Sequence, residues 1–162
     1  MILALSRVAH GASNAVTHRL DDGTTLVWEL LDEPPADAVL SAPVDVRPGW
    51  LMRHDRVDFP PGGIAYRHTH PGPGIRYLLH GSLRIDSAGA THEYGPGEAW
   101  FESGPEPVLA TASETGDTAF VRVLLLPPEW EGKRTVRYVD PDDEERPKTQ
   151  RATVFLEQPV NL

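Results

Sequence analysis

The sequence predicts an all-β fold, a barrel or sandwich built from short strands. Runs rich in apolar and β-branched residues recur after Pro- or Gly-containing turns at intervals of roughly eight to twelve residues. The chain also holds 16 prolines and 14 glycines, which suit many tight turns and interrupt long helices. This punctuation favours an antiparallel β architecture over a helical or parallel α/β fold.

The length of 162 residues fits one domain with a sizeable core. We expect a single domain over 1–162, with a barrel core at about 50–126, an N-terminal extension 1–49 and a C-terminal extension 127–162.

Composition excludes several classes of function. The net charge of −9 argues against a nucleic-acid partner, because binding phosphates requires a basic surface. The absence of cysteine excludes disulfides, thiolate metal sites and a cysteine nucleophile. No apolar run approaches the roughly 20 residues of a membrane helix, and the first residues lack the basic region of a signal peptide. We therefore expect a cytoplasmic protein without a membrane partner.

The N-terminal extension gives the weakest pattern. Residues 1–20 show no clear period. The run Thr24–Leu31 follows the turn Asp21-Asp22-Gly23 and fits either a strand or a short helix. Residues 36–48 are expected to form a loop or irregular edge, because their prolines prevent a long helix.

The barrel core is predicted strand by strand from the turns that bound each run. Thr118–Leu126 is almost continuously apolar, which indicates a central strand covered on both faces. The acidic run 140–145 is expected to be a solvated loop. The predicted strands are Trp50–Phe59, Ile64–His70, Ile75–His80, Leu83–Asp86, Thr91–Tyr94, Ala99–Glu102, Val108–Ala112, Thr118–Leu126 and the C-terminal Thr153–Leu156.

Two histidines one residue apart carry the clearest functional signal. In an extended strand His68 and His70 point to the same side, where they can grip a metal ion or orient a ligand. The pattern around them resembles the first motif of the cupin superfamily: Gly62 is followed by five residues and the His-x-His pair, and Gly81 closes the motif. That motif carries a glutamate at the position that Gly74 occupies here.

The second cupin motif is mostly lost. The full motif is Gly, five residues, Pro-x-Gly, two residues, His, three residues and Asn. Gly97 fits its first position. Ser103 and Pro105 stand where Pro and Gly are expected, Val108 where the metal-binding histidine would be, and Ala112 where the Asn would be. The resemblance implies the cupin fold, a double-stranded β-helix or jelly roll, with degenerate metal-binding motifs.

Metal-dependent cupins hold Fe, Mn, Ni, Zn or similar divalent ions with three His and one Glu. The resemblance carries only two of these positions over to this chain, His68 and His70, which are a weak set for a divalent ion. A substitute ligand is conceivable at His80, which faces inward if the strand alternation from position 74 is unbroken. Weaker candidates on neighbouring strands are Glu98, Glu102 and His54.

Arg76 favours another interpretation. The same alternation points it inward, where a cation repels a metal ion and favours an anionic ligand. We therefore predict a pocket that binds a small polar or anionic molecule through His68, His70, Arg76 and His80.

Two alternatives stay open. One is a metal-dependent dioxygenase or isomerase with His68 and His70 as ligands, and the other is a metal-free isomerase with a histidine as general base. No catalytic residue is identified. A homodimer is expected from the habit of cupins and from the terminal strands.

Overall fold

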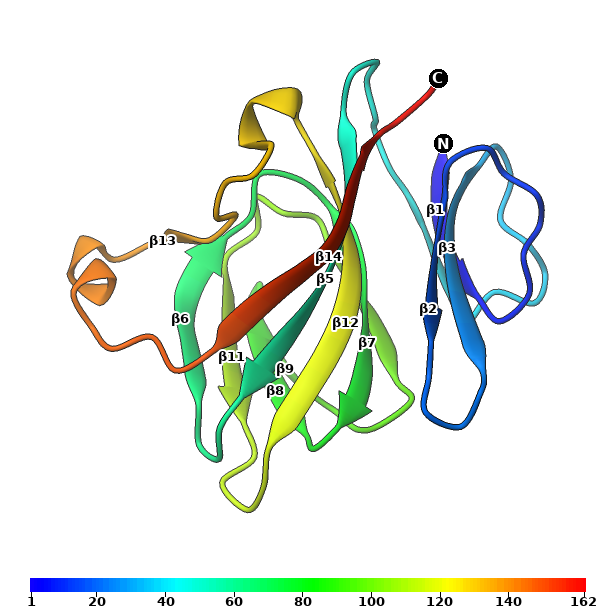
Figure 1. Cartoon of the computed structure of the whole chain (residues 1–162). Coiled ribbons are helices and arrows are strands. Elements are labelled where there is room, and N and C mark those ends of the chain that lie inside the picture. Colours follow the sequence, from blue (N-terminus) through cyan, green and yellow to red (C-terminus); the bar gives the residue numbers. More distant parts are fainter.

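The computed structural model describes residues 1–162, which form three antiparallel sheets (Figure 1). The N-terminal sheet has the strand order β2-β3-β1-β4, and the barrel is made of two five-stranded sheets, β10-β7-β12-β5-β14 and β13-β6-β11-β8-β9. No helix is long and apolar enough to cross a membrane. The strands are β1 (Ile2–Ser6), β2 (Ala15–Arg19), β3 (Thr25–Leu31), β4 (Leu40–Pro43), β5 (Leu51–Phe59), β6 (Ile64–Thr69), β7 (Gly74–His80), β8 (Leu83–Ser87), β9 (Ala90–Tyr94), β10 (Ala99–Glu102), β11 (Val108–Ala112), β12 (Thr118–Leu126), β13 (Arg137–Tyr138) and β14 (Arg151–Pro159).

The all-β jelly-roll prediction is confirmed, and β12 lies at the centre of its sheet between β7 and β5. Its continuous apolar sequence follows from burial on both faces. On one face Val121 and Val123 pack against the N-terminal sheet, and on the other Phe120 packs inside the barrel.

The N-terminal extension is more ordered than its sequence indicated. Leu3 and Leu5 of β1 are fully buried, β1 pairs with both β3 and β4, and the run Thr24–Leu31 is resolved as a strand. The sheet covers the outer face of β7 and β12 (Figure 1). Short strands of this kind, placed by long-range packing, give little periodic signal of their own.

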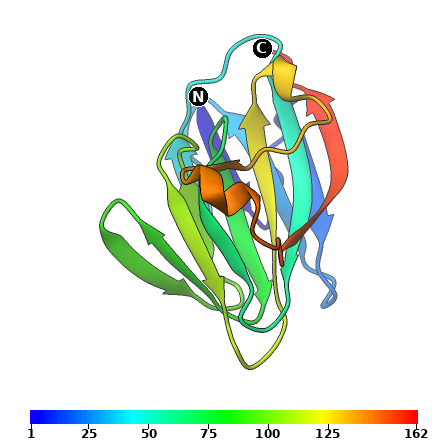
Figure 2. The ribbon, with the colours of Figure 1, turned by 90° about the vertical axis from the view of Figure 1, so that its left-hand side faces the viewer.

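Residues 127–150, hereafter the strap, cross from one barrel sheet to the other (Figure 2). The strap contains two short 3-10 helices, Pro128–Trp130 and Pro141–Glu144, and the two-residue strand β13, which pairs with β6. Arg53 anchors it by donating 2.7 Å hydrogen bonds to the carbonyl oxygens of Trp130 and Lys133. Val136 and Gln150 of the strap line the space between the two barrel sheets, so the strap forms part of the cavity wall.

Candidate functional site

A cavity of about 60 Å³ lies between the two barrel sheets and opens to solvent at its mouth. Eleven of its seventeen lining residues are hydrophobic, and the six polar ones come from different elements of both sheets and from the strap. The polar residues are His68, His70, Arg76, Glu102, Arg122 and Gln150.

His68 is held as a neutral base. Its Nδ1–H donates a 2.7 Å hydrogen bond to the carbonyl oxygen of Tyr66, which leaves the lone pair on Nε2. Burial is the main cause that lowers its pKa. The ring lies edge-on to His70 with centroids 4.9 Å apart, as the one-residue spacing on a strand predicted.

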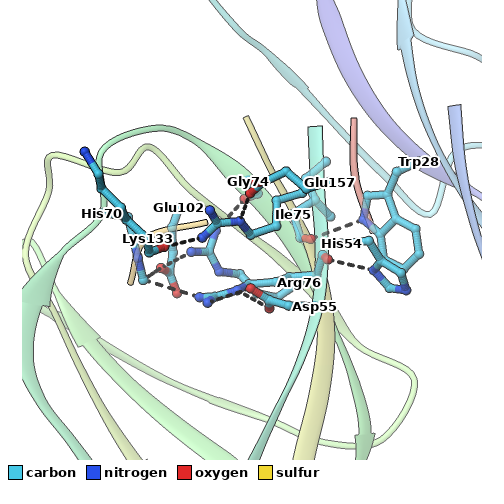
Figure 3. Close-up of polar contacts among 12 residues, drawn as sticks. Trp28, His54, Asp55, His70, Gly74, Ile75, Arg76, Glu102, Lys133 and Glu157 are labelled. Atoms are coloured by element: carbon cyan, nitrogen blue, oxygen red, sulfur yellow. Dashed lines mark hydrogen bonds and ion pairs between the residues drawn. The ribbon is translucent and has the colours of Figure 1, made fainter. Parts of the chain in front are cut away.

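His70 faces the charged part of the cavity (Figure 3). Its Nε2 lies 3.5 Å from Nη1 of Arg122, and because arginine can only donate, Nε2 accepts. Nδ1 therefore carries the proton. It lies near the backbone of Thr135 without a hydrogen bond of acceptable geometry. Burial, followed by the charges of Arg122 and Arg76, holds the pKa of His70 well below its usual range, so the ring is neutral.

Arg76 is a fully buried cation whose pKa burial lowers to about 10. Its Nη1 donates to the carbonyl oxygen of Gly74 at 2.7 Å, and its Nη2 lies 2.7 Å from Oε2 of Glu102 (Figure 3). The second contact is an ion pair without the direction of a hydrogen bond, and Nε has no partner. Glu102 is in turn held by the indole N–H of Trp100 at 2.8 Å.

A second ion pair lies beside the first. Arg122 stands directly opposite Arg76 on one side and Asp55 on the other in the strand register. It donates two hydrogen bonds to the Asp55 carboxylate, at 2.7 and 3.2 Å. Like charges on adjacent strands repel, so Asp55 and Glu102 are needed to compensate the two arginines. With neutral histidines, the two cations and two carboxylates sum to zero.

The prediction that His80 faces the cavity is wrong. His80 is exposed, and its Nδ1 lies 3.1 Å from the carbonyl oxygen of Asp117. The cause is a register shift in the β7–β12 pairing between Ala119, opposite His80, and Phe120, opposite Leu78. A bulge inserts one residue and reverses the alternation, so the inward placement that holds for Arg76 ends before position 80.

Of the weaker candidates, only Glu102 reaches the cavity. Glu98 caps a turn by accepting from the backbone N–H of Gly95 at 2.6 Å. His54 lies on the opposite face of β5, where its Nδ1 is 2.9 Å from the carbonyl oxygen of Arg122.

Three polar residues in or beside the cavity, Arg122, Asp55 and Gln150, were not predicted as site residues. A usable signal existed for Arg122, because it is the single charged residue within the almost continuously apolar run of β12. Asp55 alternates with apolar residues in β5, whereas nothing in the strap sequence distinguishes Gln150.

The barrel of two antiparallel sheets agrees with the jelly roll that the resemblance implied, and His68 of the His-x-His pair lies on the cavity wall from strand β6. The fold is a cupin barrel. No protein-family model matches the sequence, and no curated protein matches it.

Several solved structures resemble the chain in the arrangement of their strands. KdgF from a Halomonas species is 21% identical with a TM-score of 0.41, over 50% of this chain and 72% of that one. An RmlC-like cupin from Shewanella frigidimarina is 15% identical with a TM-score of 0.43, over 53% and 84%. The polyketide cyclase RemF from Streptomyces resistomycificus is 20% identical with a TM-score of 0.45, over 85% and 80%.

The residues of this cupin barrel do not fit the divalent ion that the resemblance implies. No group of three or more His, Asp or Glu side chains is placed to hold a metal. A Cβ at Gly74 would lie 2.4 Å from the carbonyl oxygen of Val123, so no ligating side chain can stand there. Val108 pairs with His68 where another histidine would be needed. The Nε2 lone pair of His70 already faces the guanidinium of Arg122.

Proposed function

We propose that this cupin barrel binds a small molecule with an apolar body and a polar oxygen head, and that it needs no metal ion to do so. The observation that carries the proposal is Arg76, a fully buried guanidinium on the wall of a mostly apolar cavity with an unpaired Nε–H. Buried donors are normally satisfied, so an acceptor from a ligand is the natural partner.

The apolar body follows from the remaining wall. Phe59, Trp100 and Phe120 form a row of aromatic rings, with centroid separations of 6.2 Å between the two phenylalanines and 5.4 Å between Trp100 and Phe120. Apolar walls with a few fixed polar groups are typical of small-molecule sites.

The net charge of the cavity side chains determines how each kind of polar oxygen group on a ligand can bind. Because the four charged side chains cancel, a carbonyl oxygen can bind without altering the net charge of the cavity. A carboxylate adds one negative charge to a buried site, and we expect it to bind with uptake of a proton by His68 or His70. Both heads supply the acceptor that Arg76 lacks.

Calorimetric titration with a panel of aromatic and branched aliphatic acids and ketones tests this proposal. Arg76→Met should weaken every ligand that wild type binds by about tenfold or more, because a charged hydrogen bond is lost. Arg76→Met/Glu102→Gln, which leaves no unpaired carboxylate, guards against a folding defect. Arg84→Met, on the exposed side of β8, is the matched control. Equal affinities for wild type and both Arg76 variants would refute the proposal.

Metal content separates this proposal from the dioxygenase or isomerase alternative. We expect plasma mass spectrometry to find no stoichiometric Fe, Mn, Ni or Zn in wild type after incubation with each ion, and ligand affinity to be unchanged by EDTA. Near-stoichiometric metal that disappears in His68→Ala/His70→Ala would support the alternative and overturn the metal-free proposal.

A further inference from the structure

His68 presents a free ring nitrogen to the cavity. Its Nδ1–H is committed to the carbonyl oxygen of Tyr66 at 2.7 Å, so Nε2 carries the lone pair. Nε2 makes no hydrogen bond to the protein and, unlike Nδ1 of His70, it is not sealed off from the open space of the cavity. In His70 the lone pair already faces Nη1 of Arg122 at 3.5 Å. His68 is therefore the histidine of the pair that is free to take a proton from a bound molecule.

Arg76 supplies the complementary group on the same cavity, an unpaired Nε–H. The ring centroids of His68 and His70 are 4.9 Å apart, and Nε2 of His70 lies 3.8 Å from Oε2 of Glu102. The same oxygen lies 2.7 Å from Nη2 of Arg76. His68 is the second residue from the end of β6 and Arg76 is the third residue of β7, so the short turn between these strands sets them at a similar depth in the barrel. A base and an oxygen-binding donor therefore face one small space.

The size of the cavity limits what can lie between them. Its volume is about 60 Å³, and a water molecule needs about 10 to 15 Å³ by the same measure. The enclosed part of a ligand is therefore roughly four to six non-hydrogen atoms, the size of a carbonyl group with its neighbouring carbons. A larger body would extend toward the mouth.

We propose that the barrel catalyses proton transfer at the carbon next to a carbonyl group, with His68 as the general base and Arg76 as the donor that holds the carbonyl oxygen. This inference rests on the proposed function, and it adds a reaction and a catalytic residue to it.

The transfer needs no further reactant. Nε2 of His68 takes the proton from the α-carbon, and the electron pair of the C–H bond forms a C=C bond. The π pair of the C=O bond moves onto the oxygen, where Nε–H of Arg76 stabilises the enolate. Return of a proton from the imidazolium to the carbon restores the carbonyl compound. The net charge of the cavity is unchanged throughout, because the imidazolium and the enolate cancel.

Deuterium exchange tests the proton transfer. Pyruvate and butanone are small carbonyl compounds with hydrogens on the α-carbon, and proton NMR in D2O follows the loss of these hydrogens. We expect wild type to exchange them faster than buffer, and His68→Asn to lower the rate about a hundredfold or more, the usual contribution of a general base. His68→Asn keeps an N–H that can reach the carbonyl oxygen of Tyr66, and calorimetry should show that it still binds both compounds. His92→Gln, which changes an exposed histidine of β9, is the matched control and should exchange as wild type does.

The outcomes distinguish the two proposals. Exchange that persists in both His68→Asn and His68→Gln would assign the proton transfer to another group and overturn the inference. Loss of binding together with exchange in both variants would overturn it too, because His68 would then be a binding residue rather than a base. If wild type binds acids or ketones without exchanging pyruvate or butanone, the inference is overturned and the proposed function stands. If wild type binds no acid or ketone, both proposals fall.

Discussion

A single glycine shows why the cavity of this cupin barrel lacks the glutamate of the first motif. Gly74 stands where the first motif expects a glutamate, and its carbonyl oxygen fixes Nη1 of Arg76. A Cβ there would lie 2.4 Å from the carbonyl oxygen of Val123 and 2.7 Å from Cδ2 of Leu124. The close approach of β12 thus excludes a side chain at 74 and leaves the space to the arginine.

This crowding predicts the cost of the smallest substitution. Gly74→Ala should lower the free energy of unfolding by about 3 kcal/mol, the upper part of the range for overpacking, because the backbone of β12 must move. Gly116→Ala is the control, since a Cβ at Gly116 meets nothing within 4 Å. Urea denaturation of both variants measures the difference. Similar stabilities for the two would show that β7 and β12 separate easily.

The ion pair of Arg122 and Asp55 predicts a larger effect than its surface counterparts. Their side chains are only 6% and 2% exposed, so Asp55→Asn leaves a buried cation without its counter-charge. We expect a loss of about 3 to 5 kcal/mol of unfolding free energy. Glu144→Gln breaks an exposed ion pair, in which the side chains of Arg134 and Glu144 are 55% and 51% exposed. It should lower the free energy of unfolding by no more than about 1 kcal/mol. Urea denaturation should separate the two variants clearly, and equal losses would contradict the burial argument.

At the scale of elements, an imidazole pair joins the N-terminal sheet to the barrel. Nδ1 of His18 on β2 lies 3.0 Å from Nε2 of His54 on β5, and Phe155 of β14 packs on both rings. Burial is the main cause that lowers the pKa of each histidine. The folded protein therefore keeps both rings neutral where the unfolded chain takes up protons.

The buried pair of His18 and His54 predicts that the folded protein loses stability as the pH falls. Below about pH 6.5 the unfolded state binds more protons than the folded state, so the free energy of unfolding falls as the pH falls. His10, whose pKa its hydrogen bond to Glu29 raises, acts in the opposite direction at the surface. Thermal denaturation from pH 7.5 to 5.5 should show a smaller loss for His18→Gln/His54→Gln than for wild type. His92→Gln, which changes an exposed residue of β9, should lose stability with falling pH as wild type does. An equal dependence of thermal stability on pH in all three proteins would rule out His18 and His54 as its cause.

Elements also show what the sequence could predict. The barrel strands from β5 to β12 were predictable because Gly and Pro turns bound each of them and alternation places their side chains. The placement of His80 failed because a bulge leaves no mark on the alternation pattern. Arg122 and Asp55 were missed because their partners are distant in sequence, and register alone brings them to Arg76. The cupin motif identified the His68–His70 wall but not the ion pairs that replace its ligands.

At the scale of the whole molecule, β14 leaves one edge of the barrel open. It ends its sheet, with β5 on one side and no strand on the other. Val154, Phe155 and Leu156 expose 54%, 51% and 40% of their surface in one consecutive run. Natural edge strands are usually protected by charges or a covering segment, and an apolar edge of this kind is a template for another strand. Two copies can satisfy it symmetrically, since a two-fold axis pairs an edge with itself.

We therefore propose a homodimer formed through β14, consistent with the expectation from the sequence. Light scattering coupled to size exclusion should give twice the monomer mass for wild type at micromolar concentrations. Val154→Lys/Leu156→Lys should give the monomer, because two charges would be buried at the paired edge without partners. Val139→Lys replaces an equally exposed apolar residue of the strap and should remain dimeric. A monomeric wild type would refute the proposal. Dissociation caused equally by Val139→Lys would place the interface elsewhere, because apolar exposure alone does not specify a partner, whereas an unpaired strand edge also specifies its direction and register.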